Sequence, residues 1–245
     1  MSKAILITNG QHALNQTIAT KLLEGGYRVM LHLETEEQSK RYIESLPAES
    51  VAQLYLSCVE LANEQSYVQV VDDALLVMGS LDVIIHGNEL LEEEKLLIES
   101  PDELGGAVST VFDRIFLWNK AAVSYMMKRK SGKVLFPIVY DTLYYDQYPS
   151  SPILNHGKIS LMKSLSRECS AFRIDVNVMT FGYHDADFDK AEKKEKQRML
   201  EIYGLKPVLK PLSEMVGMLN FLIDAPSSLI GGQNIEIGIG VETNM

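Results

Sequence analysis

Short apolar runs alternate along the chain with longer segments whose apolar residues recur at helical spacing. The first run, Ala4 to Ile7, is continuously apolar, as in a strand that is buried on both faces. A helix is predicted over residues 14–24, where it ends at Gly25 and Gly26, and a second strand over residues 27–33. This alternation predicts an α/β domain in which helices cover both faces of a parallel sheet.

The same pattern continues to the carboxyl end of the chain. Asn63 is a favourable residue for starting a helix and Gly79 for ending one. Further strands are predicted over residues 51–58, 81–85, 134–139 and 174–180, and helices over 36–46, 63–78, 101–130, 151–172 and 212–223. With 245 residues, 46% of them hydrophobic, and no linker or repeat, the chain is predicted to form a single domain over residues 1–245 with six or seven strands.

Composition narrows the range of partners. The formal charge of −10 argues against nucleic acid and anionic membrane surfaces, which require clustered Lys and Arg. No apolar run approaches the roughly 20 residues of a membrane span, and no targeting leader is recognised. Two cysteines, Cys58 and Cys169, do not make a disulfide framework and favour a cytoplasmic location. The five histidines are scattered, so no metal site is expected.

Three strand-like segments in the second half of the chain follow a known pattern: Gly132 to Phe136, residues 174–178 and residues 231–237. They resemble the fifth, sixth and last strands of the short-chain dehydrogenase/reductase family, particularly of its members of the 3-oxoacyl-[acyl-carrier-protein] reductase type. Lys158 matches the lysine of the family's Tyr-x-x-x-Lys pair. The resemblance implies a Rossmann-like doubly wound sheet of about seven strands, a homo-oligomer (dimer or tetramer), and a mobile substrate loop over residues 184–203.

The family's glycine-rich turn after the first strand, T-G-x-x-x-G-x-G, is altered. Asn9, Ala13 and Asn15 replace its three glycines, and Asn15 puts a polar side chain where the third glycine allows close packing. Asn tolerates the left-handed conformation, so the turn itself can persist. His12 either binds an anion or fills the vacant space. Two interpretations stay open, a turn that binds nothing and a changed nucleotide site; we expect NAD(P) binding to be weak or absent.

Other cofactor positions also differ from the family. Glu34 follows the second strand, where an acidic residue would hold the adenosine ribose, although a solvent-facing glutamate that leads into the next helix is the favoured interpretation. The family's N-N-A-G motif reads His86-Gly87-Asn88-Glu89, in which Gly87 keeps a flexible turn. The candidate cofactor residues are Thr8, Asn9, Gly10, His12, Ala13, Asn15, Glu34, Gly87 and Gly182, the last matching the glycine after the sixth strand.

The resemblance places the catalytic positions on residues that mostly cannot move a proton. Leu154 stands at the position of the catalytic tyrosine, Val139 at that of the serine, and Val111 at that of the supporting asparagine. Only Lys158 is retained, and a structural role is at least as compatible with it, since a long helical side chain can extend to the surface. Loss of a positioned general acid typically costs roughly 10²–10⁴ in rate, so ordinary carbonyl reduction is not expected.

Three residues are candidates for rescuing the chemistry. Tyr140 and Tyr148 belong to a tyrosine-rich segment before the predicted helix 151–172, and His156 lies inside that helix. His156 is two positions from both Leu154 and Lys158, so we expect it to point away from the face that they share.

Three functions therefore remain open. The main hypothesis is a non-catalytic oligomeric binding or regulatory protein, alone or assembled with an active relative. The alternative is an NAD(P)-dependent oxidoreductase that transfers hydride between carbonyl and alcohol with a redesigned site. A third is a small-molecule binder or a non-redox enzyme that uses the crevice at the carboxyl ends of the strands.

Overall fold

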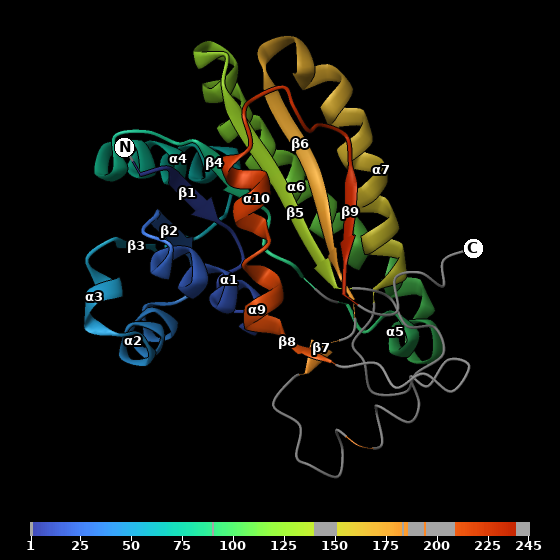
Figure 1. Cartoon of the computed structure of the whole chain (residues 1–245). Coiled ribbons are helices and arrows are strands. Elements are labelled where there is room, and N and C mark those ends of the chain that lie inside the picture. The colour runs from blue at the N-terminus through green and yellow to red at the C-terminus, as the bar shows by residue number, and fades with distance from the viewer. Residues whose placement is uncertain are drawn as a thin grey trace.

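A computed structural model of the chain describes residues 2–89, 91–139, 151–182, 184–185, 194 and 209–238. A seven-stranded sheet, parallel throughout, runs in the order β3-β2-β1-β4-β5-β6-β9 (Figure 1). Its strands are β1 (Ala4–Ile7), β2 (Arg28–His32), β3 (Leu54–Ser57), β4 (Val83–Ile85), β5 (Gly132–Val139), β6 (Ile174–Phe181) and β9 (Asn234–Ile237). The predicted fold class is confirmed.

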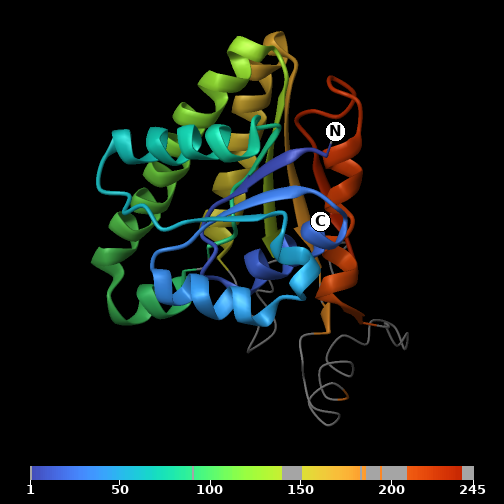
Figure 2. The same ribbon diagram turned by 90° about the vertical axis from the view of Figure 1, so that its left-hand side faces the viewer.

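Helices cover both faces of this sheet, as Figures 1 and 2 show. On one face lie α4 (Glu64–Met78), α6 (Pro101–Arg129) and α7 (Pro152–Cys169), which enclose the larger core around Trp118 and Phe136. On the other face lie α1 (Ala13–Glu24), α2 (Glu36–Ser45), α9 (Leu212–Val216) and α10 (Leu219–Asp224), which cover the second core around Leu31 and Phe181. Both layers are needed because every strand from β4 to β6 is buried on both sides.

Local sequence signals account for many of the boundaries. Asn63 caps α4 by accepting a hydrogen bond from the Ser66 amide, and Gly79 ends it in the left-handed conformation. Some boundaries differ from expectation. The predicted strand 51–58 is shorter because α3 (Ala48–Val51) forms after Pro47, and the predicted helix 212–223 is divided at Gly217 into α9 and α10.

Besides α3, three short elements of the described residues were not predicted: α5 (Glu93–Glu99), and the paired strands β7 (His184–Asp185) and β8 (Lys210–Pro211). A turn of 3-10 helix, η1 (Ser170–Phe172), extends α7. The predicted substrate loop 184–203 lies outside the described residues except at His184, Asp185 and Lys194.

The strand order places a switch point between β1 and β4. After β1 the chain continues through β2 and β3 on one side, and after β4 it continues through β5 and β6 on the other. The connections that follow β1 and β4 therefore start side by side at the carboxyl edge of the sheet and lead to opposite halves of it. In open α/β sheets ligands bind in the crevice at such a point.

Candidate active site

The turn after β1 keeps a shape suited to an anion, although polar residues replace two glycines of the family's motif. Asn9 adopts the left-handed conformation, with φ 54°, as the sequence suggested. Gly10 packs so closely on β2 that a Cβ would lie 2.5 Å from Leu31 Cγ. His12 is the N-cap of α1 without a side-chain capping bond, and Ala13, the first helical residue, is exposed. No acidic residue occupies the first turn of α1, so its free amides present an unopposed positive end.

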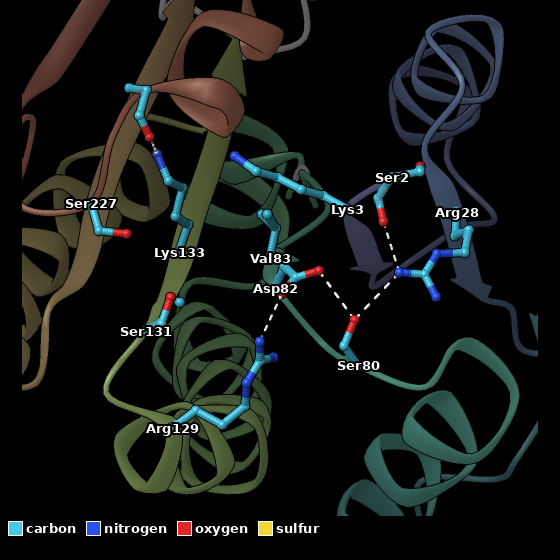
Figure 3. A pocket seen from close by; sticks show the side chains of 12 residues that line it. Ser2, Lys3, Arg28, Ser80, Asp82, Val83, Arg129, Ser131, Lys133 and Ser227 are labelled. Carbon is cyan, nitrogen blue, oxygen red and sulfur yellow. Dashed lines mark hydrogen bonds and ion pairs between the residues drawn. The ribbon is translucent and has the colours of Figure 1, made fainter.

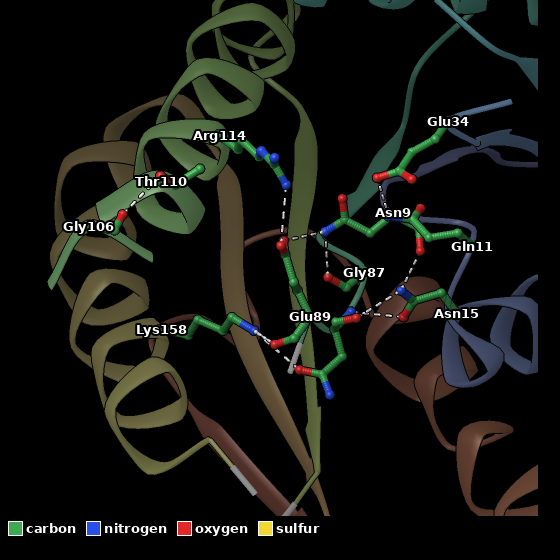
Figure 4. A network of polar contacts seen from close by, with 11 residues as sticks. Asn9, Gln11, Asn15, Glu34, Gly87, Glu89, Gly106, Thr110, Arg114 and Lys158 are labelled. Carbon is green, nitrogen blue, oxygen red and sulfur yellow. Dashed lines mark hydrogen bonds and ion pairs between the residues drawn. The ribbon is translucent and has the colours of Figure 1, made fainter. Parts of the chain in front are cut away.

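Asn15 does not stand in the path of a diphosphate. Its side chain is fully buried beneath the turn, where Nδ2 donates to Asn9 O (2.8 Å) and to Asn88 O (3.0 Å). Asn15 Oδ1 accepts from the Asn88 amide at 2.8 Å. The amide thus replaces the close packing of the family's third glycine with three hydrogen bonds, two of which join the β1 side of the crevice to Asn88 in the loop after β4 (Figure 4).

Gly87 is required for space and not for flexibility. Its φ is not positive, but a Cβ there would lie 1.9 Å from Thr8 O. Thr8 is buried, and its Oγ1 accepts from the Gly87 amide at 3.0 Å. The expectation of a flexible turn at Gly87 is wrong, because this residue forms the tight junction between the two loops of the crevice.

A cavity of about 190 Å³ opens beside this junction at the carboxyl ends of β1, β2 and β3. Glu34 is exposed at its rim and accepts a hydrogen bond from Gln11 Nε2 at 3.0 Å. His32 lies deeper, with Nε2 3.0 Å from Val59 O, and burial lowers its pKa. The lining residues are Asn9, Gln11, His32, Glu34, Val59, Glu60, Leu61 and Arg114. The cavity has the size and polarity to hold part of a nucleoside.

Lys158 reaches the same crevice from α7 (Figure 4). Its side chain is buried, and Nζ lies 3.2 Å from Asn88 Oδ1 and 3.4 Å from Glu89 O, both in the loop after β4. A buried amine needs such acceptors because an unpaired buried charge is costly. The lysine is therefore directed into the switch-point crevice and does not extend to the surface.

The other three positions that the resemblance marked as catalytic carry buried apolar side chains. Leu154 is fully buried, Val139 ends β5, and Val111 packs into the larger core. His156 is exposed on α7, as predicted from its helical position. Tyr140 and Tyr148 lie outside the described residues. Gly182 has a structural role, since its amide donates to Ile237 O and fixes the end of β6 to β9.

Sequence reasoning missed a buried carboxylate beside Leu154. Glu93, on α5, is almost fully buried and accepts from the Ile153 amide (2.9 Å) and the Leu154 amide (3.1 Å) at the start of α7. Ser151 Oγ bonds the Leu91 backbone, so α5 is held on the amino end of α7. An acidic residue after the fourth predicted strand was the signal in the sequence that could have indicated this group. It was overlooked because the helix α5, which carries Glu93, was not predicted.

His86, the first residue after β4, is a second missed group. Its ring stacks on Phe136 with centroids 4.6 Å apart, and Nε2 lies 2.9 Å from Asn119 Oδ1. Burial lowers the pKa of His86 to about 4. The imidazole is thus neutral near pH 7, and it supports the floor of the crevice without adding charge.

Another cavity, of about 320 Å³, lies at the opposite edge of the sheet (Figure 3). Its cations are engaged with backbone oxygens: Arg28 with Met78 O, Arg129 with Leu81 O, and Lys133 with Leu222 O and Ala225 O. These carbonyls lie at or near the ends of helices, where cations are stabilising. The cluster therefore has a structural explanation.

Comparisons with known proteins identify the family of this chain. The sequence profile described as short chain dehydrogenase matches residues 3–197. The chain belongs to the short-chain dehydrogenase/reductase family. It is 22% identical over 240 residues to 3-oxoacyl-[acyl-carrier-protein] reductase FabG of Salmonella typhimurium, covering 98% of this chain and 97% of the relative. It is also 22% identical over 251 residues to dehydrogenase/reductase SDR family member 4 of Oryctolagus cuniculus, covering 100% and 95%.

Solved structures share the fold of this short-chain dehydrogenase/reductase. NAD+-bound xylitol dehydrogenase superposes with a TM-score of 0.76 at 17% identity, covering 97% of this chain and 98% of that one. A short chain dehydrogenase from Bacillus anthracis superposes with a TM-score of 0.73 at 19% identity, covering 96% of this chain and 94% of that one.

No described helix is long and apolar enough to cross a membrane, and the described residues contain no cluster of metal-ligating side chains.

These relatives contradict the main functional hypothesis. The proteins that match over nearly the whole chain are named as reductases and dehydrogenases, so the prediction of a non-catalytic binding or regulatory protein is wrong. The inference failed because it equated three replaced side chains with a lost site. The crevice, its cavity and the inward-pointing Lys158 are all present.

Proposed function

We propose that this short-chain dehydrogenase/reductase is an NAD(P)-dependent oxidoreductase that interconverts a carbonyl and an alcohol. One observation carries the proposal: a cavity that can hold part of a nucleoside and the buried amine of Lys158 both lie at the switch point of the sheet. A nicotinamide cofactor, when bound, supplies the hydride donor or acceptor.

Three features of the crevice suit such a dinucleotide. The first turn of α1, which begins at the exposed Ala13 and is free of carboxylates, suits the pyrophosphate, and Asn15 is directed inward, away from it. Glu34 suits the hydroxyls of the adenosine ribose, because its carboxylate stands at the rim of the cavity. Lys158 suits the nicotinamide end, since it lies on the other side of the junction formed by Asn15 and Asn88 (Figure 4).

The proton must follow a different route from that of the family's tyrosine. Leu154 and Val139 can neither donate nor accept a proton. Lys158 Nζ carries protons and points into the crevice, so we assign it the exchange with the substrate oxygen, directly or through a water molecule. Asn88 and the Glu89 carbonyl orient the amine by accepting two of its hydrogen bonds.

The proposal predicts a preference for NADH over NADPH. Glu34 and Glu60 line the cavity, and their carboxylates would repel a ribose 2′-phosphate. In calorimetric titrations we expect NADH to bind at least about tenfold more tightly, a difference of about 1.4 kcal/mol. Glu34→Gln should narrow this ratio, whereas Glu37→Gln, an exposed α2 residue paired with Arg41, should leave it unchanged. Failure of both nucleotides to bind to the wild type and also to a Glu89→Gly variant would refute the oxidoreductase.

We also propose a homo-oligomer in a reducing compartment such as the cytoplasm. Large apolar side chains remain exposed on α6 and α10, including Phe116 (64% exposed) and Phe221 (54%). Cys58 and Cys169 are free thiols. Light scattering at micromolar concentration should give the mass of a dimer or tetramer; a mass near 27.5 kDa would contradict the assembly.

A further inference from the structure

The crevice is spanned by side chains of the protein itself. Asn9, in the loop after β1, donates from Nδ2 to Gly87 O (3.2 Å) and to Glu89 Oε2 (3.3 Å) in the loop after β4. Figure 4 shows these contacts crossing between the two loops. The bridge lies at the switch point, where a ligand of an open α/β sheet has to enter.

A third element closes the bridge from the opposite side. Arg114, on α6, lies with Nη1 3.3 Å from Glu89 Oε1, so the two carboxylate oxygens of Glu89 join the β1 loop to α6. The Glu89 side chain is only 16% exposed, against 43% for Arg114. Its backbone is held by Lys158, which lies 3.4 Å from Glu89 O. The carboxylate is therefore fixed in place and is not a solvated surface charge.

The location of this carboxylate is unfavourable for a dinucleotide. Asn9 and Arg114 line the cavity at the carboxyl ends of β1, β2 and β3. Lys158 contacts the backbone of Glu89 from the side that faces away from this cavity. A dinucleotide that fills the cavity and reaches Lys158 must pass the bridge with its negatively charged pyrophosphate. Glu89 stands at the last position of the family's N-N-A-G motif. The family has glycine at this position, and glycine would leave the path free of a side chain.

We propose that Glu89 determines the affinity of this site for dinucleotides. Its carboxylate occupies the phosphate path between Asn9 and Arg114 and turns away when the dinucleotide binds. Arg114 then loses its ion-pair partner and pairs with a phosphate oxygen instead. The inference rests on the proposed function, since it presupposes that a dinucleotide enters the crevice.

Calorimetric titration of the full-length chain with NADH, at one fixed salt concentration, tests the role of Glu89. Glu89→Gly should tighten binding about tenfold, equivalent to about 1.4 kcal/mol. Glu89→Gln, which keeps the size of the side chain and removes its charge, should tighten binding by a smaller factor of about three to five. The matched control is Glu92→Gln, three residues further along, where an exposed carboxylate pairs with Lys95; its affinity should equal that of the wild type.

A second pair of variants tests the release of Arg114. In the Glu89→Gly background, Arg114→Gln should weaken NADH binding about tenfold, because the guanidinium then contacts phosphate. The proposal is overturned if neither Glu89 variant binds more tightly than the wild type. If wild type and both Glu89 variants all fail to bind NADH or NADPH, the oxidoreductase itself is refuted. Binding by the variants with a silent wild type would support the blocking role directly.

Discussion

Replacing Lys158 by Met lowers the rate of carbonyl reduction by roughly 10²–10⁴, the range expected when a positioned acid–base group is removed. The amine of Lys158 carries protons and points into the crevice from α7. Met keeps much of the length and apolar volume of the side chain, so the core around α7 stays filled. NADH affinity should also fall about tenfold, because the amine that orients the ribose end is lost. Single-turnover kinetics with a panel of aldehydes and ketones, together with calorimetry, measures both effects.

The matched control is Lys163→Met on the same helix, where the lysine is exposed. This variant should keep the activity and affinity of the wild type. Lys158→Arg should bind NADH while showing a changed pH dependence of turnover, because a guanidinium does not release its proton in the usual pH range. Full activity of Lys158→Met would show that the proton travels through another group, and a tyrosine of the 140–150 segment would be the next candidate.

The fold follows from the sequence to a large extent because its signals are local and repeated. Continuous apolar strands such as Ala4–Ile7 require burial on both faces, and Gly79 can end α4 in the left-handed conformation at no steric cost. The prediction of the fold is wrong where contacts between residues far apart in the sequence determine an element. The α5 helix depends on Glu93 reaching the amino end of α7, a contact between residues about 60 positions apart. Periodicity within a window of residues contains no information on such a contact.

The site illustrates the same limit in chemical terms. Motif comparison identifies which residues stand at the positions of Asn15, Glu89 and Lys158, but it does not give the direction of their side chains. Asn15 turns inward and strengthens the junction that it was expected to disturb. Glu89 turns across the crevice and joins Asn9 to Arg114. A replaced glycine therefore has opposite consequences at the two positions, and only the orientation of the side chain distinguishes them.

Gly87→Ala destabilises the protein by about 3 kcal/mol or more, the largest effect on stability that we expect from adding a single methyl group. The new Cβ would lie 1.9 Å from Thr8 O and 2.6 Å from Asn15 Nδ2. Neither atom can yield cheaply, since one is backbone and the other belongs to a fully buried amide. The loops after β1 and β4 must separate, which breaks the bond from the Gly87 amide to Thr8 Oγ1 and the bond from the Asn88 amide to Asn15.

Urea denaturation followed by circular dichroism measures this loss, with Gly106→Ala as the control. Gly106 lies on the exposed face of α6, where an added Cβ meets no heavy atom within 4 Å. Alanine there should stabilise the helix by up to about 1 kcal/mol. The two alanine variants should thus move the urea midpoint in opposite directions. If Gly87→Ala unfolds at the same urea concentration as the wild type, the two loops are not in the close contact described, and the bridge that Glu89 forms across them would lose its structural basis.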